Sequence, residues 1–497
     1  MTVDNADPHA RTPPTRAATR KERFVSFIWD SDYYTKSEAE RWLVFKLDCF
    51  ILPVVCLGWL MKYIDQSNIT NAYVSGMKED LNIHANEYTY MILCYNVAAV
   101  IMMLPGNLIA LKMRPSYLLA GCEILWMVFT FAQAGARNST DLYIFRFFVG
   151  FFEASFAPVV LFLLGSWYTS AELAKRTSIW FIAGNAGQAF SGYMQAALYT
   201  TLNGKLGLAG WRWLYIICGI MTFPTAMLVL FFLPDFPHNC RLRWITPAER
   251  EMARARCARN GTAEITGQID FALVKRVLGN WRWWCIVPTY IVYATACQDY
   301  NYFAIWLKGH NSGVVKANIW ASGLFLTGIP FAVGYAYLAD LLRNRFIVCF
   351  CALCWACVPT GIIAVHPVHI WGLMIFAFFT CYTFFITPVI FSWFNEIAHG
   401  NAEERAVIIA SANMGFAIFN CWLPTIIFKQ TDGPRFKKGF ATTFSCAAAS
   451  PFLFLLLKLM HDRQKRREQA ERDALEDVES REGDKEKEGG MDRIVTA

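Results

Sequence analysis

Long runs of apolar residues recur along most of the chain, each ended by a short polar segment. The runs are about 20 residues long, the length that an α-helix needs to cross a hydrocarbon layer of about 30 Å. Backbone groups inside a bilayer must be hydrogen-bonded within their own segment, so we predict helices. The twelve predicted spans are 46–64, 88–110, 116–136, 141–164, 177–200, 210–233, 284–306, 319–339, 345–365, 370–391, 406–428 and 437–460.

The spans form two groups of six around a polar segment, which begins where Pro234 and Pro237 end the sixth helix. Within this segment Thr246, Pro247 and Glu249 predict the start of a short helix, which Gly261 ends. The sequence therefore predicts an all-α membrane protein of two pseudo-symmetric halves. Its parts are an N-terminal segment (1–45), a first half (46–233), a linker (234–283), a second half (284–460) and a charged tail (461–497).

Composition and charge agree with a membrane protein. The 497 residues are 55% hydrophobic and only 17% charged, which is too few charges to coat a water-soluble globule of this size. Segments after the second, fourth, sixth and eighth spans are richest in Lys and Arg, so both termini are predicted to be cytoplasmic. The segment 429–439 runs against this rule, with four basic residues on the predicted outer side. The net charge of +7 reflects this loop bias, and we predict no nucleic-acid partner.

Motifs for enzymatic chemistry are missing from the sequence. There is no G-x-x-x-x-G-K-[ST] phosphate-binding loop, and no Ser/His/Asp or metal-spaced cluster stands out. We therefore predict no enzyme, no cofactor and no metal site.

Polar residues inside the spans are the candidates for function, because each costs free energy unless it faces protein or water. The fourth span reads YIFRFFVGFFEASFAP and holds Arg146, Gly150 and Glu153. Arg146 and Glu153 are seven residues apart, hence on one helical face, with Gly150 between them to admit a neighbour. Arg146 stays charged, whereas a partly buried Glu153 can titrate. The two residues form either a proton-coupling pair or a static ion pair that positions helices.

The first span ends in a polar face with Asp65 and Asn68 near the outer surface. Asp65 either supplies a charge to a transport path or caps the helix and holds an outer gate. Further spans carry single polar residues that either face a substrate or bond between helices. These are Asn96, Gln188, Asp299, Asn301 and Asn413.

A charged loop joins the eighth and ninth spans. It reads GYAYLADLLRNR and carries Asp340, Arg343 and Arg345, which can clamp a tight turn or hold a closed gate. The alternative is ordinary cytoplasmic positive charge. The matching loop in the first half, GNLIALKMRPS, keeps Gly106 and Arg114 but has no acid. This pattern resembles the loop signature of the major facilitator superfamily.

Several blocks in order extend the resemblance over residues 42–460. They include YIDQSNITNAYVSGMKEDL, RFFVGFFEA, SWYTSAELAKR, GWRWLYIICG and FNEIAHGNAEERAVIIASANMGFAIFNCWLP. Together they resemble the fungal anion–cation symporter (allantoate permease) branch, in particular its pantothenate and vitamin transporters. The family often has Asp-Arg after the first span, where this chain has Asp65-Gln66.

The resemblance implies proton-coupled uptake of a small organic anion by alternating access at the plasma membrane. Arg146 would then pair with a substrate carboxylate, and Glu153, or else Asp65 or Asp299, would take the proton. The alternative is export of a fungal secondary metabolite or drug. Exporters of this superfamily often have a Gly-Pro motif in the fifth helix, and its absence here favours import.

Two sequons lie near the predicted outer face. They begin at Asn68 and Asn138, and both are weak candidates for glycosylation because they are close to the membrane.

Overall fold

The computed structural model describes a protein built of helices. Helices overlie all twelve predicted spans, and no strand occurs in the part of the chain that the structure describes. That part comprises residue 29 and residues 36–242, 244–259, 271–310, 312–342, 344–367, 370–384, 386–398 and 402–495.

The first half holds six spans. In chain order they are α2 (Glu38–Ala72), α4 (Glu87–Lys112), α5 (Pro115–Ala134), the pair α6 (Ser139–Glu153) and α7 (Phe156–Trp167), α8 (Ser170–Leu202) and α9 (Gly210–Phe232). The short helix α3 (Lys78–Asp80) follows the first span, and α10 (Pro247–Arg259) lies in the linker. Thr246 and Glu249 form the predicted start of α10, since each backbone N–H bonds the other side chain.

The second half repeats this arrangement after the linker helix α11 (Phe271–Gly279). Its spans are the pair α12 (Trp281–Ala296) and α13 (Phe303–Gly309), then α14 (Val314–Leu342), α15 (Arg345–Val365), the pair α16 (Trp371–Cys381) and α17 (Thr387–Ile397), α18 (Ala402–Ile427) and α19 (Lys437–Val495). The last helix continues through the charged tail.

Three spans are broken, which the apolar pattern does not reveal. The fourth breaks between α6 and α7 at Ala154 and Ser155, and the tenth breaks before α17. Pro158 and Pro388 explain both, because a proline ring clashes with the carbonyl four residues earlier, here those of Ala154 and Phe384. The seventh span breaks in a polar stretch, where the 3-10 turn Asp299–Tyr302 separates α12 from α13.

Eight of the described helices or helix pairs are long and apolar enough to cross a membrane. Four predicted spans lie outside this set. In the second and the tenth, the apolar helices Glu87–Met103 and Trp371–Cys381 are shorter, in the fifth α8 carries several polar side chains, and the seventh is broken. Their places within the bundle, rather than their hydropathy, make them spans.

The first span is longer than predicted. Helix α2 runs to Ala72 and ends in a π-helical turn, where Gly76 adopts a φ of +108°, a value that L side chains rarely adopt. The expected helix end near residue 64 is therefore wrong. Asp65 and Asn68 lie inside the helix with no exposed surface, and neither caps its end. Their polar groups bond neighbouring helices, so they do not terminate α2.

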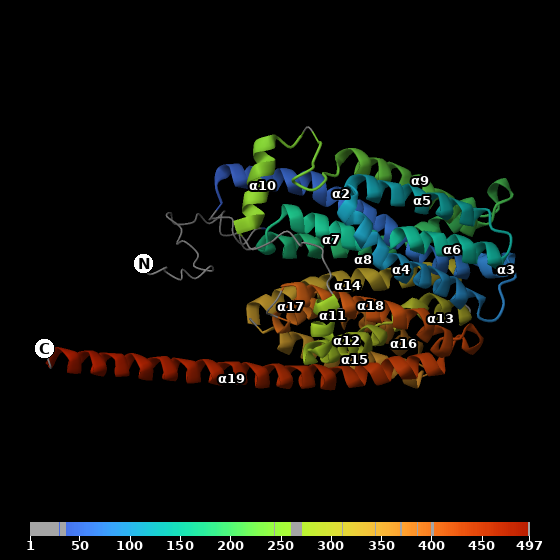
Figure 1. Cartoon of the computed structure of the whole chain (residues 1–497). Helices are drawn as coiled ribbons and strands as arrows, with labels where there is room; N and C mark the ends of the chain where they lie inside the picture. The colour runs from blue at the N-terminus through green and yellow to red at the C-terminus, as the bar shows by residue number, and fades with distance from the viewer. Residues whose placement is uncertain are drawn as a thin grey trace.

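The two halves lie side by side along their length (Figure 1). Helix α8 packs against α14 and helix α4 packs against α18, which joins the halves. A Cβ on Gly192 of α8 would lie 2.0 Å from Ser322 Oγ of α14, and one on Gly187 would lie 2.5 Å from the Leu60 carbonyl of α2. These glycines therefore permit close helix approaches.

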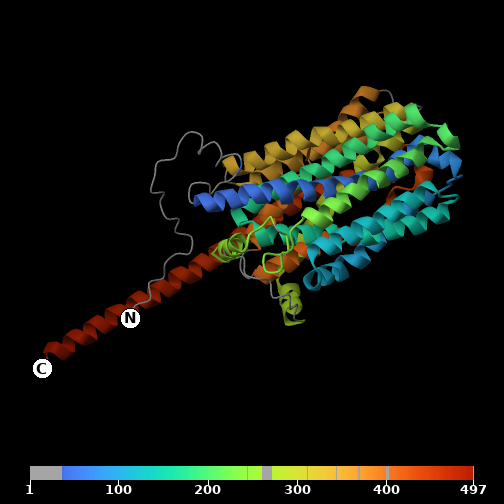
Figure 2. The same ribbon diagram turned by 90° about the horizontal axis from the view of Figure 1, so that it is seen from above.

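The two ends of the bundle differ. One end, here called the linker end, carries α10, the start of α2 and the extension of α19, which continues straight beyond the bundle (Figure 2). The other end, here called the loop end, carries α3 and the turns next to it. By the distribution of Lys and Arg, the linker end is the predicted cytoplasmic side.

Candidate functional site

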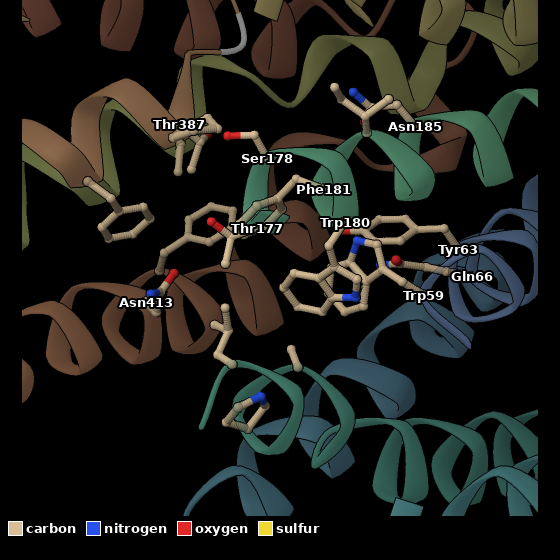
Figure 3. Close-up of a pocket in the computed structure, with 18 of the residues that line it drawn as sticks. Trp59, Tyr63, Gln66, Thr177, Ser178, Trp180, Phe181, Asn185, Thr387 and Asn413 are labelled. Atoms are coloured by element: carbon tan, nitrogen blue, oxygen red, sulfur yellow. The ribbon is translucent and has the colours of Figure 1, made fainter. Parts of the chain in front are cut away.

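A large cavity of about 3230 Å³ lies between the two halves. Its lining reaches the linker end at Glu251, Arg254 and Asn395 and extends through mid-bundle to Tyr88 and Thr89 in the first turn of α4. At mid-bundle, side chains of α2 and α8 face side chains of α17 and α18 (Figure 3). The residues at this level include Trp59, Tyr63, Gln66, Thr177, Ser178, Trp180, Phe181, Asn185, Thr387 and Asn413.

The halves are joined by polar contacts at the loop end. Asn318 Nδ2 donates to Ser75 Oγ at 3.0 Å, in the turn that follows α2. Lys308 Nζ lies 3.0 Å from Glu79 Oε1, and the Gln430 backbone N–H donates to Asn86 Oδ1 at 3.0 Å. The cavity therefore faces the linker end, with the loop end sealed.

Four charged side chains of α2 and α6 gather beside the cavity, and we call them the buried quartet: Lys62, Asp65, Arg146 and Glu153. Asp65 and Glu153 have no exposed surface and Arg146 is 1% exposed. Arg146 Nη1 donates to the Asp65 carbonyl at 3.4 Å, and Lys62 Nζ donates to the Glu153 carbonyl at 3.4 Å. The Glu153 carboxyl interacts electrostatically with the other three side chains.

Neighbouring hydroxyl groups satisfy half of the quartet's carboxyl oxygens. The Tyr95 hydroxyl donates to Glu153 Oε2 at 2.6 Å, and the Thr130 hydroxyl donates to Asp65 Oδ2 at 2.6 Å. The Arg146 guanidinium also lies 4.7 Å from the centre of the Tyr95 ring. Asp65 Oδ1 and Glu153 Oε1 are buried with no hydrogen-bond partner among the described residues. Each therefore has a lone pair free to accept a proton.

The local chain explains this assembly. A Cβ on Gly150 would lie 2.3 Å from the Tyr95 carbonyl, so glycine lets α4 approach α6 closely enough for Tyr95 to reach Glu153. Glu153 is also the last residue of α6, where the break leaves its carbonyl without a helical partner. Lys62 supplies a positive charge at this carbonyl end.

The structure brings together three predicted residues, Asp65, Arg146 and Glu153, although only Arg146 of these lines the cavity. Four others also line it: Asn96, Gln188, Asn301 and Asn413. Asp299 does not join them. It is buried within the second half, where Cys381 Sγ lies 3.9 Å from Asp299 Oδ2.

Interhelical hydrogen bonds occupy several of the predicted amides. Asn68 Oδ1 accepts from Ser191 Oγ of α8 at 2.9 Å, and it has no exposed surface. We therefore do not propose Asn68 for glycosylation. Asn138 is exposed and caps α6, and its use stays a prediction. Asn96 Nδ2 donates across the halves to the Asn420 carbonyl at 3.3 Å.

Sequence reasoning missed Lys62, Tyr95 and Thr130. A signal for Lys62 was available, because a lysine inside an apolar span is as unusual as Asp65, which follows it by three residues. Tyr95 and Thr130 carried no such signal, since tyrosine and threonine are common in membrane helices.

Comparison with known proteins settles the family. Residues 55–467 match the family model of the Major Facilitator Superfamily. The chain belongs to this superfamily. Membership makes it a multi-pass membrane transporter of small molecules and not an enzyme.

Its similar proteins include named fungal transporters. Pantothenate transporter FEN2 of Saccharomyces cerevisiae is 31% identical over 431 residues, which cover 84% of each chain. Pantothenate transporter liz1 of Schizosaccharomyces pombe is 33% identical over 420 residues, which cover 82% of this chain and 80% of liz1. MFS transporter PfmaC of Pestalotiopsis fici is 30% identical over 463 residues, or 88% and 84% of the two chains.

Solved structures show the same fold. A bacterial homologue of the human lysosomal transporter Spinster, solved in an inward-facing and unoccupied conformation, matches with a TM-score of 0.58 and 12% identity. The match covers 86% of this chain and 97% of that protein.

The loop signature of the superfamily is built differently in the two halves. In the second half, Arg345 forms an ion pair with Glu396 at the end of α17. Arg343 and the side chain of Asp340 lie outside the described residues. In the first half, the loop itself has no acidic residue. Asp235, which follows α9 in the chain, takes the place of that residue.

This acid bonds the start of α5. Asp235 Oδ1 accepts from the Ser116 hydroxyl at 2.6 Å and from its backbone N–H at 3.2 Å. Arg114 Nη1 lies 3.9 Å from Asp235 Oδ2. The missing acid is thus replaced by one that lies more than a hundred residues further along the chain.

A second charged group, here called the linker latch, holds α10 and the N-terminal segment to the first half. It comprises Lys36, Asp48, Glu172, Arg176 and Arg256. Arg176 binds Asp48 through two bonds of 2.7 and 2.6 Å. Glu172 pairs with Lys36 and, at 2.9 Å, with Arg256 of α10. The latch fixes α10 to the half that contains the quartet.

Glu172 stays ionised in the latch. Burial would raise the pKa of its carboxyl, but the Arg256 guanidinium and the Lys36 ammonium outweigh burial and lower that pKa. A depressed folded-state pKa contributes stability above the ordinary carboxyl pKa, and this stability is lost as the pH falls through the folded value. The latch is therefore fully formed near neutral pH.

We expect Glu172→Gln to weaken the docking of α10 by about 3 kcal/mol, because it leaves Arg256 buried without its carboxylate. Trypsin should then cleave at the arginines of α10 faster than in the wild type, by a factor that stays constant between about pH 6 and pH 8. The control is Glu249→Gln, which removes a more exposed 3.1 Å pair with Lys46 and should cost below about 1 kcal/mol. Equal cleavage of both variants would contradict a special role for Glu172.

Proposed function

We propose that this transporter carries a small organic monoanion, such as pantothenate or a related carboxylate vitamin, together with a proton across the plasma membrane. The observation that carries the proposal is the buried quartet, in which Glu153 has an unpartnered oxygen beside the basic side chains of Lys62 and Arg146. The relatives named as pantothenate transporters support the substrate class.

The cavity suits a small acid with polar and apolar parts. Arg146 lines it at its deep end, and amide groups of Asn185 and Gln188 line one wall. The Tyr382 hydroxyl donates to Asn185 Oδ1 at 2.9 Å, so these amides are held in place. The aromatic ring of Phe181, which lines the cavity and is 37% exposed, offers a surface for the apolar part.

The cycle follows from the two ends of the cavity. In the outward-facing conformation, a proton from the external water binds Glu153 Oε1, and the anion enters the cavity beside Arg146. The polar contacts that seal the loop end then form. The linker end opens, which gives the conformation of this structure. Release of the anion and of the proton into the cytoplasm returns the quartet to its ionised form.

Uptake measurements test the proposal. In a yeast strain that lacks its own pantothenate carrier, we expect uptake of radiolabelled pantothenate that rises in acid medium and collapses with a protonophore. Arg146→Ala should abolish it at equal surface expression. Absence of uptake, with the protein at the cell surface, would reject pantothenate. Faster loss of preloaded label from expressing cells than from control cells would instead support export.

A further inference from the structure

Lys62 is a lysine held inside the membrane-spanning part of α2. Its ammonium donates to the Glu153 carbonyl at 3.4 Å and lies 5.0 Å from the centre of the Trp59 ring. Trp59 lines the cavity, whereas Lys62 is half-buried and is not one of the lining residues. Lys62 thus acts on the cavity through its charge, without touching a substrate.

The charges of the quartet sum to zero when both carboxyl groups are ionised. Lys62 and Arg146 contribute two positive charges, and Asp65 and Glu153 contribute two negative ones. A proton on Glu153 leaves one positive charge in excess. Excess charge in a buried site is costly unless an opposite charge compensates it.

The other groups that face Glu153 do not supply that compensation. From α2 the Tyr63 hydroxyl interacts with it, from α4 the Tyr95 hydroxyl, and from α9 the Cys218 thiol. All three are neutral in their ordinary protonation states near neutral pH. The compensating charge must therefore come from the cavity.

We propose that Lys62 is the positioning residue that makes this transporter select an anion, and that one proton moves with one monoanion. This proposal rests on the proposed function. Because of Lys62, the quartet is neutral before Glu153 takes a proton and carries one positive charge afterwards. A substrate carboxylate in the cavity balances that charge. Without Lys62 the protonated quartet is already neutral, and an uncharged cargo fits better than an anion.

The first test compares two probes in proteoliposomes that contain the full chain: pantothenate and its uncharged primary amide. We expect Lys62→Gln to lower the preference for the acid over the amide at least about tenfold, and Lys62→Arg to keep it within about threefold. The control is Lys316→Gln, since Lys316 also stacks on a tryptophan, 4.8 Å from the Trp320 ring, but is exposed and far from the quartet. An unchanged preference in Lys62→Gln would overturn the proposal.

The same vesicles test the coupling ratio. Movement of one proton with one monoanion transfers no net charge. Wild-type uptake should therefore stay the same when a potassium gradient with valinomycin imposes a membrane potential. A rate of uptake that changes with the imposed membrane potential would overturn the one-to-one ratio.

A second arm of the test, which measures thermal unfolding, needs no substrate. We expect Lys62→Gln and Glu153→Gln each to lower the thermal unfolding temperature of the protein in nanodiscs at pH 7.5, because each unbalances the quartet. The double variant should recover most of the loss, since its charges again sum to zero. Additive losses would overturn charge balance. If wild-type vesicles take up neither probe, the substrate assignment fails, and this arm still decides the role of Lys62.

Discussion

Glu153→Gln is expected to end the accumulation of substrate against its gradient while leaving equilibration across the membrane. Glutamine keeps the shape of Glu153 and its contact with Tyr95 but cannot exchange a proton. The quartet then carries its excess positive charge permanently, so the anion binds without a proton. For one proton per anion, an inward gradient of one pH unit supports at most about tenfold accumulation in the wild type. The variant should reach a ratio of about one.

The measurement is the steady-state ratio of internal to external label in proteoliposomes with an imposed pH gradient. The matched control is Glu123→Gln in α5. Glu123 is also a fully buried membrane carboxyl, but no charged side chain is paired with it among the described residues. It should accumulate label as the wild type does. Persistent accumulation in Glu153→Gln would place the proton elsewhere, on Asp65 or Asp299.

Arg146→Met is expected to lose both folded protein and uptake. The substitution leaves two buried carboxylates with only Lys62 to compensate them, and breaking a buried charge set in this way costs about 3–5 kcal/mol. Methionine also forfeits the contact of the guanidinium with the Tyr95 ring. The thermal unfolding temperature in detergent measures the first effect, and uptake at equal surface expression measures the second.

A second substitution separates charge from recognition. Arg146→Met combined with Asp65→Asn restores a neutral quartet, so the unfolding temperature should recover most of its loss. Uptake should stay absent, because the Arg146 guanidinium no longer faces the cavity. A single Arg146→Met variant that unfolds at the wild-type temperature would show that Arg146 does not stabilise the buried carboxylates.

The helices could be predicted because the bilayer imposes a simple rule on them. Hydropathy gave the number and order of spans, whereas the breaks depended on single prolines at Pro158 and Pro388. The fifth span is polar enough to fall below a strict hydropathy threshold. It is held in place by packing against α2 and α14, which a window of sequence does not contain.

The site was predictable only along single helices. The spacing of Arg146 and Glu153 placed both on one face of α6, as the structure has them. The end of the apolar run predicts that the helix ends near Asp65, but interhelical bonds allow α2 to continue to Ala72. The spacing of residues along one helix also does not show which other helix packs against it. Tyr95 and Asp235 reach their partners from other segments, and neither could be assigned in advance.

The seal at the loop end sets how readily the transporter changes state. Its polar contacts, Ser75 with Asn318, Glu79 with Lys308 and Asn86 with Gln430, involve neutral groups or an exposed ion pair. Contacts of these kinds contribute about 0.5–1.5 kcal/mol each, so together they favour the sealed state by only a few kcal/mol. An energy difference of that size leaves the other conformation populated at about 0.1–10%. We therefore expect the empty molecule to sample both openings, and a cargo of modest affinity to shift their populations.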